Sequence, residues 1–317
     1  MAHGNGVHKV IKRVLILGDN YAGSSIIKAL SQTDLEIHVA HQYAPASLTD
    51  GFTHHISDIT TSLTSLFQQL HPDLIISTAS GGSFSTQQNI IDSAIEAQVP
   101  RFVPAEFSHD SLNKNIQGRL PPSRERARTI EYLQQQAKAG RIEWVGVATG
   151  TTLDHGILSG NLGFDLKWQS ATLHGQGHER FAASSSAWIG RAMLAIIEHW
   201  EDVKNQYLYA SGLPTSGNEV VSALEKETGK TFTVGRADVE ECIHEAERRL
   251  QQGFPDAGMF LMERSVLYDE SLDAVRAFEE ADAKEKLGLE AESLHDIVHG
   301  VLHDEREHGG KPGCGCD

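Results

Sequence analysis

Short apolar runs that alternate with helical patterns constrain the fold of this chain more than any other feature. The runs are largely apolar along their whole length, as in strands that are buried on both faces of a parallel sheet. The strand pattern occurs at 14–17, 35–40, 74–76, 101–103 and 142–147, and helical spacing occurs at 24–30, 63–70, 88–97 and 123–139. Because such alternation forms right-handed βαβ units, the sequence predicts an α/β protein with a Rossmann-type doubly wound parallel sheet.

The pattern changes near residue 150. Gly, Ser, Thr and His become frequent between residues 149 and 187, and helices are predicted at 187–199, 219–228, 238–252 and 290–303. We therefore expect a dinucleotide-binding domain over 1–150, a smaller substrate-binding region over 151–308, and a flexible glycine-rich tail over 309–317.

Charge and composition narrow the range of partners. The chain has 317 residues and a formal net charge of -16, and an acidic surface repels nucleic acids. No apolar stretch approaches the roughly 20 residues of a membrane helix, and the polar N-terminus has no signal-peptide core. The three cysteines fit a reducing compartment rather than a disulfide framework. We expect a cytoplasmic protein that binds a small-molecule substrate and neither nucleic acid nor membrane, with homodimerisation left open.

The turn after the first strand is a candidate phosphate loop. Gly18 and Gly23 stand where a Rossmann loop turns tightly and approaches pyrophosphate, with Asn20 and Tyr21 between them. The middle glycine is missing and the loop is one residue short, although asparagine tolerates a left-handed conformation and could partly replace glycine. Asp19 adds a negative charge close to the expected phosphate. An ordinary strand-to-helix turn is the alternative interpretation.

The end of the second predicted strand is where a Rossmann fold reads the adenosine ribose. NAD-binding enzymes place an acid there, and NADP-binding enzymes often use a basic side chain. This chain has His41, Gln42 and Tyr43, and therefore neither an acid nor an arginine. A neutral side chain such as Gln42 can still hydrogen-bond a ribose hydroxyl or a phosphate. A plain surface turn explains the same residues.

The segment RFVPAEF at 101–107 resembles the RF-(I/V)-P-S-E-F-G segment of the NmrA-like, isoflavone-reductase-like family, a group of atypical short-chain dehydrogenase/reductases. Runs at 163–167, 189–192 and 205–209 are similar to runs in its fungal members, and the resemblance spans about 12–303. It implies a Rossmann domain with a smaller substrate domain. It also implies NADPH and hydride transfer to a small aromatic or oxygen-heterocyclic compound of secondary metabolism.

The resemblance also assigns cofactor-binding positions. Gly18 and Gly23 match the phosphate loop, and Gln42 falls where the family carries the arginine that grips the 2′-phosphate. Asp58 falls near the expected adenine. The positions expected to line the nicotinamide and its ribose are Thr78, Ala79, Ser80, Pro104, Glu106 and Phe107.

The family's catalytic lysine is replaced here by Arg126. A lysine can be desolvated to a lower pKa and then act as an acid or base, whereas an arginine stays protonated. An arginine can still hold a ribose hydroxyl, a phosphate or a substrate oxyanion. Alternatively, Arg126 belongs to a solvated helix face with Arg124 and Arg128.

Three further residues follow the fourth and fifth predicted strands, whose carboxyl ends are where ligands bind in such sheets. Asp154 and His155 are candidates for proton transfer, and His109 is another. Each could instead be a loop residue that binds water or caps a helix. No metal is predicted, because the Cys-x-Cys pair near the C-terminus lies on a glycine-rich tail without zinc-site spacing.

Three functions remain open. The first is an NAD(P)H-dependent reductase, which the resemblance favours. The second is a non-redox enzyme on the same scaffold, such as a cyclase, isomerase, lyase or dehydratase, because the loop, Gln42 and Arg126 all depart from the family pattern. The third is a regulator that senses a dinucleotide without turnover. Fold does not decide among them.

Overall fold

A seven-stranded parallel sheet forms the larger part of the molecule. The computed structural model describes residues 10–43, 51–58, 61, 63–79 and 83–308, so the predicted tail at 309–317 lies outside it. The strands are β1 (Arg13–Leu17), β2 (Glu36–His41), β3 (Thr53–Ile56), β4 (Leu74–Ser77), β5 (Arg101–Val103), β6 (Glu143–Ala148) and β11 (Gln206–Tyr209). Their order is β11-β6-β5-β4-β1-β2-β3. All neighbours pair in parallel, which confirms the predicted Rossmann-type sheet.

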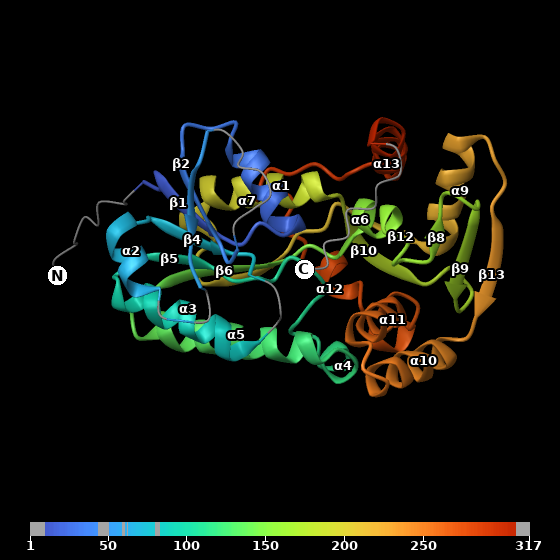
Figure 1. The fold of residues 1–317 in the computed structure, drawn as a ribbon, viewed down its shortest axis with the longest axis horizontal. Helices are drawn as coiled ribbons and strands as arrows, with labels where there is room; N and C mark the ends of the chain where they lie inside the picture. The colour runs from blue at the N-terminus through green and yellow to red at the C-terminus, as the bar shows by residue number, and fades with distance from the viewer. Residues whose placement is uncertain (1–9, 44–50, 59–60, 62, 80–82, 309–317) are drawn as a thin grey trace.

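Helices cover both faces of this sheet (Figure 1). One face carries α1 (Tyr21–Leu30) and α7 (Ser186–Glu198), and the other carries α2 (Thr64–Leu70), α3 (Phe84–Glu96) and α5 (Pro121–Lys138). Alternation along β1 explains the two layers, because Val14 and Ile16 join the core under α1 and α7, whereas Leu15 and Leu17 join the core under α2, α3 and α5.

Two strands of the sheet were not predicted. They are β3 and β11, which form its two edges. An edge strand is partly solvated, so its sequence is polar: β3 reads THHI and has no fully buried residue. The chain beyond residue 150 also returns to the sheet, since α7 packs against α1 and β11 pairs with β6.

The remaining elements extend from one end of the sheet. Two three-stranded sheets have the orders β12-β10-β7 and β13-β9-β8. Their strands are β7 (Thr151–Thr152), β8 (Phe164–Asp165), β9 (Ser170–His174), β10 (Arg180–Ser184), β12 (Leu213–Ser216) and β13 (Thr233–Ala237). The remaining helices are α4 (Lys114–Arg119), α6 (Leu153–Leu158), α8 (Trp200–Val203), α9 (Gly217–Thr228), α10 (Val239–Gln251), α11 (Pro255–Leu267), α12 (Arg276–Glu280) and α13 (Leu294–His308). No helix in these described ranges has both the length and the apolarity that a bilayer crossing requires.

Helices α10 and α11 form a hairpin that packs on α4 (Figure 1). Their shared core contains Ile116 and Leu120 from α4 and Met262 and Val266 from α11. We did not predict α11, although Pro255 at its first turn is a common helix-start signal. The hairpin brings α11 to the edge of the large sheet where its strands end.

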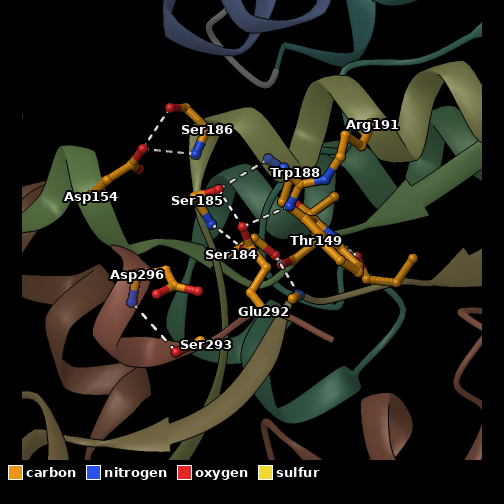
Figure 2. A network of polar contacts seen from close by, with 12 residues as sticks. Thr149, Asp154, Ser184, Ser185, Ser186, Trp188, Arg191, Glu292, Ser293 and Asp296 are labelled. Atoms are coloured by element: carbon orange, nitrogen blue, oxygen red, sulfur yellow. Dashed lines mark hydrogen bonds and ion pairs between the residues drawn. The ribbon is translucent and has the colours of Figure 1, made fainter. Parts of the chain in front are cut away.

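A buried carboxylate ties the C-terminal segment to α7 (Figure 2). Glu292 accepts hydrogen bonds from the Ser185 backbone N–H at 2.8 Å and the Ser185 hydroxyl at 2.6 Å, and Arg191 donates to it at 2.9 Å. Ser185 is the N-cap of α7, so the carboxylate lies at the positive end of the helix dipole. Only 9% of the Glu292 side chain is exposed.

We expect Glu292→Ala to lower the free energy of unfolding by about 2–3 kcal/mol, because it removes the acceptor of a buried N–H and of a buried hydroxyl. Chemical denaturation followed by circular dichroism measures this loss. The matched control is Glu290→Ala, since Glu290 is an exposed residue of the same segment. Equal stability of the two variants would show that the Glu292 contacts do not hold α7.

Candidate active site

The turn between β1 and α1 has the close packing of a phosphate loop. Gly18 has a φ of +95°, and a Cβ on Gly23 would lie 2.6 Å from the Gly18 carbonyl oxygen and 2.8 Å from Thr78 Oγ1. No other residue fits at Gly23 without moving backbone. The two glycines therefore hold the turn against the end of β4, as the sequence predicted.

Asn20, considered from the sequence as a partial replacement for the missing middle glycine, is the N-cap of α1. Its side-chain oxygen accepts the Gly23 N–H at 3.0 Å, and its amide donates to the Thr78 carbonyl oxygen at 2.5 Å. Its φ is -59°, so it does not adopt the left-handed conformation that would imitate a glycine. The cap also explains why α1 begins at Tyr21, three residues before the predicted start.

Three backbone N–H groups at this helix end remain available to an anion. Those of Asp19, Asn20 and Ala22 have no acceptor among the described residues. Such groups, together with the positive end of the helix dipole, are what binds a pyrophosphate in Rossmann folds. Thr78 forms the opposite wall and donates its hydroxyl to the carbonyl oxygens of Leu17 and Gly18. Ala79 is buried beside it, and Ser80 lies outside the described residues.

The segment after β5 places a carboxyl group in the interior. Glu106 is 1% exposed, and one of its oxygens accepts hydrogen bonds from Ser111 Oγ at 2.5 Å and from the Tyr207 hydroxyl at 3.1 Å. Its other oxygen has no hydrogen-bond partner among the residues that the structure describes. Burial raises the pKa of Glu106 to about 7, despite the charge of Arg126 and these hydrogen bonds, which lower it. Pro104 is buried, and Phe107 packs against the core under α1.

Arg126 lies beside this segment and not on a solvated helix face. With Pro104, Glu106 and Gln87 it lines a small recess, and it is half-buried. Among the described residues it forms no hydrogen bond or ion pair. By contrast, Arg128, two residues further along the helix and therefore on a different face, pairs with Glu125 at 3.1 Å and covers the Phe84 ring.

A cavity of about 150 Å³ lies next to Arg126, between the loops after β5 and β6 and helix α11. The residues that line it are Ser108, His109, Thr151, Thr152, His155, Gly156, Asn161, Leu162, Phe260, Glu263, Arg264 and Leu267. The Thr151 hydroxyl is buried there and has no hydrogen-bond partner within the described part of the chain. The cavity therefore combines an apolar wall with several titratable groups, which is the usual composition of a small-molecule site.

The pKa values in the cavity shift in opposite directions. Burial lowers the pKa of His109 to about 4, and the positive charge of Arg126 lowers it further. Burial also lowers the pKa of His155, whose ring lies 4.2 Å from the Tyr21 ring. Burial raises the pKa of Glu263, against the charge of Arg126. Both shifts disfavour the charged form of the group concerned, the imidazolium of the two histidines and the carboxylate of Glu263.

Asp154 faces away from these groups. Its carboxylate accepts hydrogen bonds from the Ser186 N–H at 2.9 Å and the Ser186 hydroxyl at 2.5 Å (Figure 2). It also accepts the His155 N–H at 2.8 Å. These contacts join the loop after β6 to the start of α7. They favour a role in positioning His155, and a catalytic role for Asp154 stays a prediction.

Two predicted cofactor residues, Gln42 and Asp58, line neither the recess nor the cavity. Both are exposed, beyond the ends of β2 and β3. Sequence reasoning missed Glu263 and Arg264 of the cavity, because no helix was predicted over 255–267 and nothing local places this segment beside the loops after β5 and β6. No group of three or more His, Cys, Asp or Glu side chains in the described ranges is arranged to hold a metal ion.

Comparisons with known proteins agree with this architecture. The chain is 32% identical over 231 residues to the oxidoreductase aprR of Aspergillus flavus, covering 73% of this chain and 77% of that protein. It is 26% identical over 236 residues to the oxidoreductase poxI of Penicillium oxalicum, covering 73% and 74% of the two chains. No protein-family profile matches.

Solved structures show the same fold. A grapevine (Vitis vinifera) leucoanthocyanidin reductase, solved as a binary complex with NADPH, has a TM-score of 0.75 at 15% identity and covers 92% of this chain and 99% of its own. An isoflavone reductase has a TM-score of 0.68 at 19% identity with the same coverage. Together with the Aspergillus flavus relative, these similarities confirm the resemblance of the sequence: the chain belongs to the NmrA-like, isoflavone-reductase-like family of atypical short-chain dehydrogenase/reductases.

Proposed function

We propose that this protein is an NAD(P)H-dependent reductase of a small aromatic or heterocyclic metabolite. The observation that carries the proposal is the half-buried Arg126, which has no pairing partner in the described part of the chain. It lines the recess with Glu106, and its charge acts on His109 and Glu263 of the cavity. A cation held in this way is available to a substrate oxygen on which negative charge develops. The oxidoreductase relatives in Aspergillus and Penicillium support the same reaction class.

The residues of the cleft fit a nicotinamide dinucleotide. The open backbone N–H groups at the start of α1 suit its pyrophosphate. The walls formed by Thr78 and Pro104, which follow β4 and β5, suit the nicotinamide and its ribose. When bound, the nicotinamide ring supplies a hydride to the substrate. NADPH is the form that the resemblance implies and that the grapevine structure contains.

In this proposal, side chains of the protein stabilise the negative charge that develops on the substrate and supply the proton. Arg126 stabilises the developing oxyanion but cannot supply the proton. Glu263 is the proton donor in this proposal, because it lines the cavity and burial raises the pKa of its carboxyl group, which favours the protonated form. His109 and His155, both uncharged, line the pocket as hydrogen-bonding groups, and Asp154 positions His155.

A non-redox enzyme on this scaffold is the second candidate. The specific observation in its favour is the cap of α1, because the Asn20 side chain occupies the Gly23 N–H that a longer glycine loop leaves open. Arg126, Glu263 and the two histidines could then serve an acid–base reaction without hydride transfer.

Titration of the purified protein with NAD(P)H, followed by tryptophan fluorescence and calorimetry, separates the two candidates. We expect micromolar binding, followed by absorbance loss at the nicotinamide band when aromatic ketones, quinones and oxygen heterocycles are screened as substrates. If no cofactor binds at millimolar concentration, the reductase is refuted and the non-redox enzyme remains.

We expect Arg126→Ala to lower kcat/KM on the best substrate of that screen by about 100-fold, the usual scale for one oxyanion-stabilising donor, with little loss of stability. The matched control is Arg124→Ala, since Arg124 is an exposed arginine on the same helix. If both variants keep full activity, Arg126 has no role in the reaction.

Glu106 predicts a pH dependence of stability that can be measured without any substrate. Its folded pKa of about 7 exceeds the ordinary glutamate value of 4.5, so between these values the folded chain keeps a proton that the unfolded chain releases. The free energy of unfolding therefore falls as pH rises through this window, by up to about 3 kcal/mol from this group. We expect Glu106→Gln to remove that slope in denaturation curves from pH 4.5 to 7.5.

Glu131→Gln on the exposed face of α5 is the control and should keep the wild-type slope. An unchanged slope in Glu106→Gln would mean that Glu106 is ionised in the folded protein.

A further inference from the structure

An acid from the loop after β1 lies at the end of β2, where a Rossmann fold binds the adenosine ribose. In doubly wound sheets the adenosine ribose lies between the loop after the first strand and the end of the second. The end of β2 has no acid of its own. However, Asp19 of the loop after β1 reaches His41, the last residue of β2, with 2.9 Å between its Oδ2 and the His41 Nδ1.

His41 in turn contacts the next strand. Its Nε2 lies 2.8 Å from Nδ1 of His54 in β3, and the two rings stack with centroids 5.1 Å apart. His41 is 4% exposed, so both of its ring nitrogens are used within the protein and neither is free for a ligand. The Asp19 side chain keeps 49% of its surface exposed. The imidazole thus holds the Asp19 carboxylate in place while about half of the side-chain surface stays exposed.

A second imidazole pair fixes the same edge of the sheet. His38 Nδ1 lies 3.0 Å from His55 Nε2, and His38 Nε2 lies 2.9 Å from Glu36 Oε1. His38 and His41 are three residues apart along β2 and therefore point to opposite faces of the sheet. Because β2 and β3 are joined on both faces, the position of Asp19 is set by paired strands and not by the loop alone.

We propose that Asp19 is the ribose-reading acid of this protein, and that it selects a dinucleotide with a free 2′-hydroxyl, NAD(H), over one with a 2′-phosphate. The inference rests on the proposed function, since it concerns the same cofactor cleft. It assigns to Asp19, through its contact with His41, the role that an acid at the end of β2 has in other Rossmann folds.

Charge complementarity supports this selection. A carboxylate accepts hydrogen bonds from ribose hydroxyls, whereas it repels a phosphate dianion at the same place. Asp19 and His41 pair with no lysine or arginine among the described residues. The sequence from Gln42 to Thr53 contains no lysine or arginine either. A 2′-phosphate would therefore meet a negative charge without a compensating cation.

The test compares ligands that differ only in the 2′-phosphate. Binding of NADH and NADPH, and of ADP-ribose and its 2′-phosphate, is measured at pH 8 by calorimetry. We expect the unphosphorylated member of each pair to bind at least about tenfold more tightly, the scale of one unfavourable charge contact. Equal affinities, or tighter binding of the phosphorylated members, would overturn the inference and leave the reductase intact. Binding of neither NADH nor NADPH would overturn the proposed function and this inference with it.

Variants assign the preference to Asp19. Asp19→Asn keeps an oxygen for the His41 contact and removes the charge, so we expect the preference to shrink by about tenfold. Adding Gln42→Arg supplies a cation at the exposed end of β2 and should reverse the preference. Gln32→Arg, an equal charge change at an exposed site after α1, is the control and should leave it unchanged. An unaltered preference in Asp19→Asn would refute the role of Asp19.

Discussion

The close contact between Gly23 and the carbonyl of Gly18 is the constraint on which the rest of the site depends. It leaves no room for a side chain at the start of α1, so the helix begins directly against the ends of β1 and β4. This tight turn brings Tyr21 onto His155 on one side and Asp19 onto His41 on the other. A single short loop thereby connects the cavity to the adenosine end of the cleft.

Burial divides the titratable groups of the site into different roles. Glu106 and Glu263 are pushed toward the protonated form, and His109 and His155 toward the neutral form. Among these groups Arg126 keeps its charge, and its field lowers the pKa of each of Glu106, His109 and Glu263. Arg126, which pairs with no acid in the described part of the chain, therefore acts on three titratable groups of the site at once.

The sequence predicted the central strands and their helices because these are buried and strongly patterned. It did not predict β3, whose histidines contact histidines of β2, or α11, which carries no strong helical pattern of its own. Of the predicted site residues, Glu106, Pro104 and Arg126 line one recess and His109 and His155 line the cavity, because the carboxyl ends of parallel strands lie at one side of the sheet. Gln42 and Asp58 lie apart from both. The place of Glu263 in the cavity and the Asp19–His41 contact both depend on segments that are distant in the sequence. No local sequence pattern therefore predicts them.

The α10–α11 hairpin contributes one wall of the cavity, yet its core is shared with α4 and not with the large sheet. No residue of that core belongs to either core that covers the sheet. Substitutions in α11, such as at Phe260, can therefore reshape the cavity while the strands of the large sheet stay packed as before. The hairpin makes the shape of the cavity independent of the packing that holds the sheet together.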